Sequence, residues 1–151
     1  MRNIVSGLLV LIFMAVPALA NDDLVVKKSP HSVAMTLDKL TKVFESKGIT
    51  IFARVDHAAG AKKVGAELRP TELLIFGNPK LGTPLMNADQ KIGLDLPLKA
   101  LAWQDADGTV WLAYTKPDAL KTRHNIEGRD EVFMKMTGAL NKLTDAALKA
   151  Q

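Results

Sequence analysis

The residues best suited to acid/base chemistry lie close together in the sequence, at and after the end of a stretch in which apolar and polar residues alternate. Asp56 ends the alternating stretch 49–56, His57 follows it directly, and Glu67 lies ten residues further along the chain. A histidine beside carboxylates can act as a general base or bind a metal. His57, with Asp56 or Glu67 as its partner, is therefore a candidate catalytic group. In the competing interpretation the histidine is structural and caps the helix that follows it.

A second candidate site lies in the stretch 77–86, which is rich in glycine and proline. Glycines let backbone N–H groups turn toward an anion, and a lysine and a threonine add a charge and a hydroxyl. The Gly-Lys-Ser/Thr ending of a P-loop is missing. We expect a loop here that binds a small polar or anionic ligand, and the alternative is a tight structural connection. The candidate ligand-binding residues are Arg69, Gly77, Asn78, Lys80, Gly82 and Thr83.

The sequence contains few residues that could bind a metal ion or a redox cofactor. There is no cysteine, and the histidines at 31, 57 and 124 lie far apart without the His-x-x-x-His spacing of a helical metal site. Four methionines, Met35, Met86, Met134 and Met136, fall in apolar patterns that suit core packing at least as well as copper or haem ligation. The sequence therefore predicts no metal site and no cofactor.

The first 20 residues have the pattern of a secretory signal peptide. Arg2 precedes an apolar run over 4–16, and Ala18-Leu19-Ala20 provides the small residues of a cleavage site. The run is shorter than the roughly 20 residues that span a bilayer. We expect cleavage after Ala20 and one domain over 21–151, periplasmic or secreted, with no stable membrane insertion.

Charge and aromatic content argue against nucleic-acid binding. The 20 basic and 16 acidic side chains are interspersed, and aromatic residues make up only 5% of the chain. This leaves neither a basic stripe nor a stacking platform for bases. The protein is therefore not expected to bind nucleic acid.

Hydrophobic periodicity predicts an α+β fold. Asp107-Gly108 between two strand-like runs is typical of a hairpin. The pattern favours two layers, with helices packed on one face of a mixed or antiparallel sheet. Strands are expected at 23–28, 49–56, 71–77, 98–104 and 109–115, helices at 30–47, 57–65, 117–124 and 130–150, and one or two helical turns within 87–97.

Two tryptophans fall on the predicted hairpin. Trp103 and Trp111 belong to its first and second strand. Aromatic residues are common in cores, in ligand pockets and at protein interfaces. Core packing, a pocket wall and a dimer surface are all consistent with this placement.

The central motif of the chain resembles that of the DUF302 family, a domain of unknown function. Its residues are Leu-Arg-Pro-Thr-Glu-Leu-Leu-Ile-Phe-Gly-Asn-Pro-Lys at 68–80 and Gly-Thr-Pro-Leu-Met at 82–86, with supporting segments at 56–61, 94–99, 111–114 and 123–124. The resemblance runs from about Val25 to the C-terminal helix, nearly the whole of the expected mature chain. It implies a compact α+β domain, often exported from bacteria and able to form a homodimer. It implies no reaction.

These observations are consistent with three functions. The first is a non-enzymatic exported domain that binds a small polar or anionic ligand or a protein partner, as a homodimer. The second is an acid/base enzyme using His57 with Glu67 or Asp56. The third is an accessory protein for metal or haem redox chemistry that uses histidine and methionine side chains.

Overall fold

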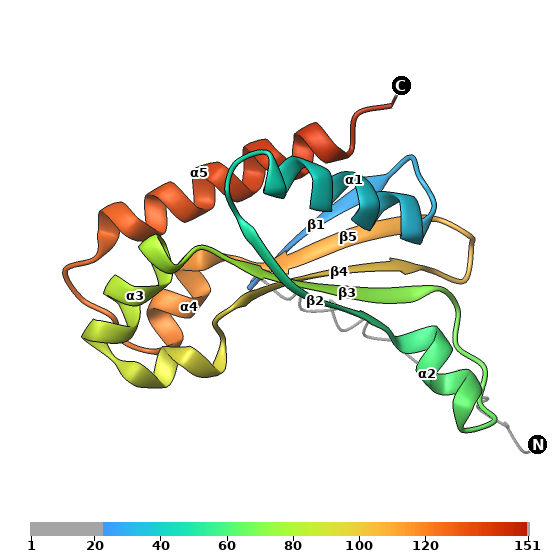
Figure 1. The fold of residues 1–151 in the computed structure, drawn as a ribbon, viewed down its shortest axis with the longest axis horizontal. Coiled ribbons are helices and arrows are strands. Elements are labelled where there is room, and N and C mark those ends of the chain that lie inside the picture. Colours follow the sequence, from blue (N-terminus) through green and yellow to red (C-terminus); the bar gives the residue numbers. More distant parts are fainter. Residues whose placement is uncertain (1–22, 151) are drawn as a thin grey trace, which may run out of the picture.

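A five-stranded antiparallel sheet organises the computed structural model, which describes residues 23–150 (Figure 1). The strand order is β1-β5-β4-β3-β2, and every neighbouring pair is antiparallel. The signal peptide predicted at 1–20 lies outside the described residues. The strands are β1 (Leu24–Ser29), β2 (Thr50–Asp56), β3 (Thr71–Gly77), β4 (Leu98–Gln104) and β5 (Val110–Thr115).

The helices lie between and after the strands. Five of the six helical segments match helices or helical turns expected from the sequence, and the sixth, α3, is discussed with the candidate site. No helix within 23–150 is long and apolar enough to cross a membrane. The helical segments are α1 (Val33–Glu45), α2 (His57–Lys63), α3 (Pro79–Ala88), the 3-10 helix η1 (Gln90–Leu94), α4 (Pro117–Arg123) and α5 (Asp130–Ala147).

Helices α1 and α5 cover one face of the sheet (Figure 1). In α1 the apolar side chains of Val33, Leu37, Leu40 and Phe44 recur at helical spacing and are almost fully buried. The Phe44 ring lies 4.4 Å from that of Phe76 on β3, between ring centroids. Burial of each such side chain contributes about 1.5–3 kcal/mol. This confirms the two-layer α+β architecture.

A second apolar cluster holds the end of the sheet where α3, η1 and α4 meet α5. Its buried members are Leu85 of α3, Ile92 of η1, Leu120 of α4, Ile126 of the turn after α4, and Phe133 and Met136 of α5. Each of these helical segments is short, and an isolated short helix is marginal in water. Packing against α5 therefore supplies much of their stability.

The predicted hairpin joins β4 and β5 through an aspartate turn. The Asp105 carboxylate accepts hydrogen bonds from the Asp107 and Thr109 amides at 3.0 and 2.9 Å, and from the Trp111 indole N–H at 2.7 Å. Gly108 has a φ of +81°, a conformation that glycine adopts at little cost. The hairpin is therefore fixed both by its backbone and by one side chain.

Candidate functional site

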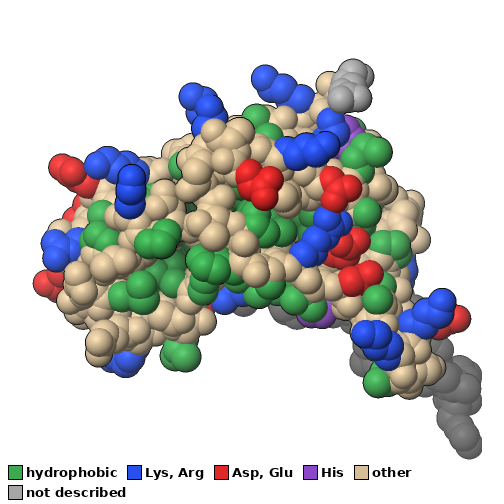
Figure 2. All heavy atoms as spheres, viewed as in Figure 1, with side chains coloured by type: hydrophobic (Ala, Val, Ile, Leu, Met, Phe, Trp, Pro, Cys, Tyr) green, Lys and Arg blue, Asp and Glu red, His purple; other side chains and the backbone are tan. Residues whose placement is uncertain are grey.

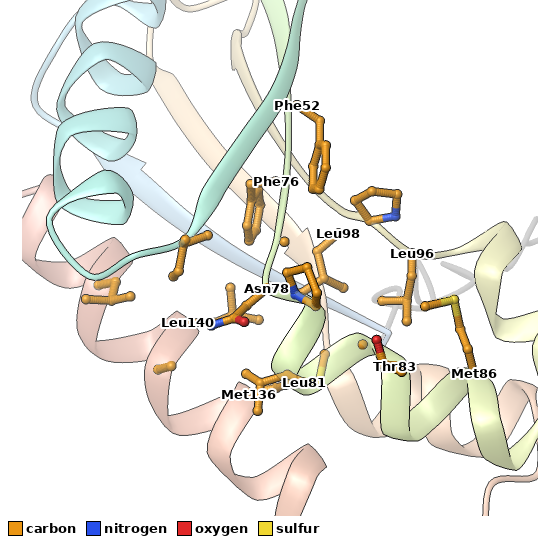
Figure 3. A pocket seen from close by; sticks show the side chains of 17 residues that line it. Phe52, Phe76, Asn78, Leu81, Thr83, Met86, Leu96, Leu98, Met136 and Leu140 are labelled. Atoms are coloured by element: carbon orange, nitrogen blue, oxygen red, sulfur yellow. The ribbon is translucent and has the colours of Figure 1, made fainter.

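An apolar cavity of about 220 Å³ lies where β2 and β3 meet α3 and α5 (Figure 3). Figure 2 shows hydrophobic side chains gathered around this hollow. Its walls come from five parts of the chain: the start of β2, the end of β3, α3, the segment before β4, and α5. The side chains labelled in Figure 3 are Phe52, Phe76, Asn78, Leu81, Thr83, Met86, Leu96, Leu98, Met136 and Leu140.

A bulge in β2 shapes one wall. The pairing register with β3 shifts between Ile51 and Ala53, so Phe52 has no direct partner and its side chain stands at the cavity. A Cβ on Gly77 would lie 3.3 Å from Cε2 of Phe52 and 3.5 Å from Cβ of Pro97. Glycine at this position leaves the space in which the phenyl ring sits.

Helix α3 forms a second wall and corrects the prediction of a loop over 77–86. Asn78 caps the helix, because its side-chain oxygen accepts a hydrogen bond from the Lys80 amide at 2.9 Å, and Pro79 occupies the first turn. Leu81 and Met86 then face the cavity. Gly82 and Thr83 therefore lie on a helix rather than in an anion-binding loop.

The cavity wall is almost entirely apolar. Of the 17 lining residues only Asn78 and Thr83 have polar side chains, and none is charged. The Asn78 carboxamide keeps its N–H donors while its oxygen serves as the cap, and the Thr83 hydroxyl can donate or accept. Such a site suits a ligand with an apolar body and one polar group.

The structure brings together four of the six candidate ligand-binding residues. Gly77, Asn78, Gly82 and Thr83 line the cavity. Arg69 instead precedes the opposite end of β3, where its Nε donates to the Gln104 carbonyl at 3.1 Å. Lys80 is exposed in the first turn of α3 and does not line the cavity.

The candidate acid/base residues lie at the opposite end of β3 from the cavity. Asp56 caps α2, its carboxylate accepting a hydrogen bond from the Ala59 amide at 2.8 Å. His57 and Glu67 are exposed, and within 23–150 no hydrogen bond or ion pair joins His57 to either carboxylate. No group of three potential metal-ligating His, Cys, Asp or Glu residues occurs in the part of the chain that is described.

Sequence reasoning missed a cluster of three polar side chains beside the cavity, Asp95, Arg123 and His124. His124 Nε2 lies 2.6 Å from Asp95 Oδ2, and Arg123 donates to the other carboxylate oxygen at 3.0 Å. Partial burial of Asp95 opposes its ionisation, but these two hydrogen bonds outweigh burial and lower the pKa of its carboxyl. Asp95 directly precedes Leu96 and Pro97 of the cavity wall. Both halves of the cluster fall in segments that carried the family resemblance, which was the available signal.

Comparison with known proteins adds relatives that are longer than this chain. It is 45% identical over 129 residues to two proteins named Fluoride-specific ion channel FluC 1, from Brucella suis and Brucella abortus. The match covers 83% of this chain but only 51% and 48% of theirs. The chain thus spans about half the length of these curated relatives.

The fold and the family have independent support. The crystal structure of an uncharacterized conserved protein DUF302 from Bacillus stearothermophilus superposes with a TM-score of 0.76 at 18% identity, over 83% of this chain and 98% of that one. At this identity the likeness concerns the fold alone. The family model described as Domain of unknown function DUF302 matches residues 25–143. The chain therefore belongs to the DUF302 family.

Proposed function

We propose that this protein is a non-enzymatic binding domain for a small molecule with an apolar body and one polar group. The observation that carries the proposal is the cavity of about 220 Å³, walled by aliphatic, methionine and phenylalanine side chains. The proposal departs from the polar or anionic ligand expected from the sequence, because no lining residue is charged. An anion there would lose its hydration without gaining a cation.

The size of the cavity narrows the ligand class. Apolar cavities of about 150 Å³ bind benzene. The present cavity has room for a single substituted ring or a short branched acyl group. Its polar group would lie toward the Asn78 carboxamide and the Thr83 hydroxyl, the polar side chains of the wall.

Three probes test the proposal by saturation-transfer NMR and calorimetry. Toluene and p-cresol should bind, with p-cresol tighter through its hydroxyl, and benzoate should bind least. Ala139→Phe fills the cavity from α5 and should reduce binding of p-cresol at least tenfold. Ala146→Phe is the matched control, since Ala146 is exposed on the same helix. Preferential binding of benzoate, or equal binding by both variants, would refute the cavity as the site.

The geometry favours binding over the acid/base alternative. Asp56 is occupied as a helix cap, and Glu67 makes no hydrogen bond with His57. A catalytic role for His57 would require it to act without either predicted partner. His57→Ala should leave p-cresol binding unchanged, and a metal or haem role would be revealed by mass added to the native protein.

A second candidate function comes from the curated relatives. In these proteins a region similar to this chain is joined to about as much further sequence, under the name of a fluoride channel. We propose that this domain acts beside such a channel as an accessory unit. Fluoride is a small, strongly hydrated anion, and the uncharged cavity offers it little. Deletion of the gene should then increase growth inhibition by fluoride but not by chloride, and unchanged inhibition would exclude this role.

We also propose that the protein is exported, because residues 1–20 have the pattern of a signal peptide. The intact mass of the protein recovered from the periplasm should correspond to a chain beginning at Asn21. A protein that retains Met1, or that is absent from the periplasm, would refute it.

A further inference from the structure

The sheet face opposite α1 and α5 carries an apolar row across all five strands. Val26, Ala113, Leu101, Leu73 and Val55 are successive cross-strand partners from β1 to β2. Partners in register point to the same side of a sheet, and the residues next to them in sequence point to the helix-covered side. We call these five residues the apolar ladder. Its two ends are exposed, Val26 by 48% and Val55 by 38%, whereas Leu73 and Leu101 are half-buried and the small Ala113 between them and Val26 is buried.

Aromatic side chains flank the apolar ladder. Trp103 and Trp111 are direct partners in the row beside it, on the same face. The indole of Trp111 is held by its hydrogen bond to Asp105. Figure 1 shows no helix of 23–150 lying across this side of the sheet, and α2, which has no buried residue, extends beyond the sheet's end. A broad apolar face of this kind marks an interaction surface.

We propose that this face docks a second copy of the chain, the two sheets packing face to face about a two-fold axis that runs along the apolar ladder. The ligand cavity is separate, since it lies where the helix-covered side meets α3 and α5. Face-to-face packing of two antiparallel sheets is the arrangement of β-sandwich cores.

The area of the face suits a dimer. Five strands at about 4.8 Å spacing and three residue rows along each strand give a patch of about 24 by 20 Å. Two copies would bury on the order of 1,000 Å² if the face were flat, and side chains that protrude from it add to this area. About 1,000 Å² is the least that a specific interface needs. The large apolar side chains would supply its core.

The positions of the charged residues on this face favour one direction of the two-fold axis over another. Lys28 and Lys99 are the charged strand residues on this side, and they lie in rows on opposite sides of the apolar ladder. An axis along the ladder exchanges those rows and places Lys99 against the partner's Trp103, where an ammonium group can contact the indole face. An axis along β4 would instead oppose Lys99 to its own copy, two like charges. The first arrangement is therefore the favourable one.

In this dimer each residue of the apolar ladder contacts the same residue of the second copy, because the two-fold axis runs along the ladder. Val26→Glu or Val26→Lys would place two like charges face to face in the dimer. An equimolar mixture of the two variants would instead pair opposite charges. Met134→Glu is the control, since Met134 is 64% exposed on α5 and lies off the face.

Native mass spectrometry and analytical ultracentrifugation of the purified protein test this inference. The wild type and Met134→Glu should be dimeric, each Val26 variant monomeric at the same concentration, and the mixture a heterodimer of the two masses. Val55→Glu, at the other end of the ladder, should give the same monomer, and far-UV circular dichroism verifies its fold. A monomeric wild type, dimers that persist in the folded single variants, or a mixture without heterodimer would overturn the proposal. p-Cresol binding should be equal in monomer and dimer, so this test is independent of the cavity.

Discussion

His124 lies 2.6 Å from Asp95, Nε2 to Oδ2, and this contact ties the end of α4 to the turn after η1. The side chain of His124 is 9% exposed and that of Asp95 21%, so solvent screens the contact only in part. Arg123 adds a second hydrogen bond to the same carboxylate. Because Leu96 and Pro97 follow directly, the contact positions one wall of the cavity.

Asp95→Asn should destabilise the protein by about 1–3 kcal/mol, since it weakens two charge-assisted hydrogen bonds at a partly buried position. Urea denaturation followed by circular dichroism measures the loss. Glu127→Gln is the control, because Glu127 is exposed in the turn between α4 and α5. Equal stability of the two variants would mean that the cluster does not hold the fold. Weaker p-cresol binding by Asp95→Asn alone would show that it positions the cavity wall.

Ionisation of Asp95 should contribute to the pH dependence of the free energy of unfolding. The pKa of its carboxyl is lowered in the folded protein, so its stabilising contribution is present above the unfolded value near 4 and is lost as pH falls through the folded value. The stability difference between the wild type and Asp95→Asn should therefore shrink below about pH 4. Urea midpoints over a pH series give this difference. A gap that stays constant through the acid range would contradict the assignment.

Gly77→Ala should weaken p-cresol binding and leave the fold intact. The added methyl would lie 3.3 Å from the Phe52 ring, which is half exposed and can shift away from its place at the cavity. Gly138→Ala offers a comparison, because nothing lies within 4 Å of its Cβ position in α5. It should raise the free energy of unfolding by about 1 kcal/mol through helix propensity and leave binding unchanged. Equal p-cresol affinities for the two variants would argue against a role for Gly77.

Asp105→Ala should loosen the β4–β5 hairpin. It removes one acceptor for two backbone amides and for the Trp111 indole. We expect a lower melting temperature and a red shift of tryptophan emission, because the indole N–H then turns to water. Asp107→Ala in the same turn is the control, since no side-chain hydrogen bond of Asp107 contributes to the hairpin. Unchanged emission would indicate that the indole is held by packing alone.

The sequence predicted the sheet well because local patterns specify it. Alternation marks 49–56, and Asp107-Gly108 marks the hairpin, so the strands were placed nearly to the residue. The helix expected over 30–47 followed from the spacing of its buried face, but in the structure it begins later, at Val33, because Ser32 is its cap and Ser29 belongs to β1. These signals depend on neighbours in the chain and need no knowledge of distant contacts.

The candidate site was harder to predict because it depends on contacts distant in sequence. Glycines and prolines in 77–86 indicated a loop, but the burial of Leu85 against the α5 cluster stabilises a helix there. The bulge that places Phe52 is not visible in a pattern of alternation. Asp95 and His124 meet only once η1 and α4 have packed, so no spacing rule could pair them.

The pairing of β1 with β5 has a consequence for the order of folding. The first strand of the sheet pairs with the last, so the chain must be available as far as Thr115 before the sheet is complete. Contacts between such distant segments slow folding, because a long loop must close before they form. The complete sheet of this topology can form only after β5 has been synthesised. That delay is compatible with passage through a translocation channel, the route that residues 1–20 predict.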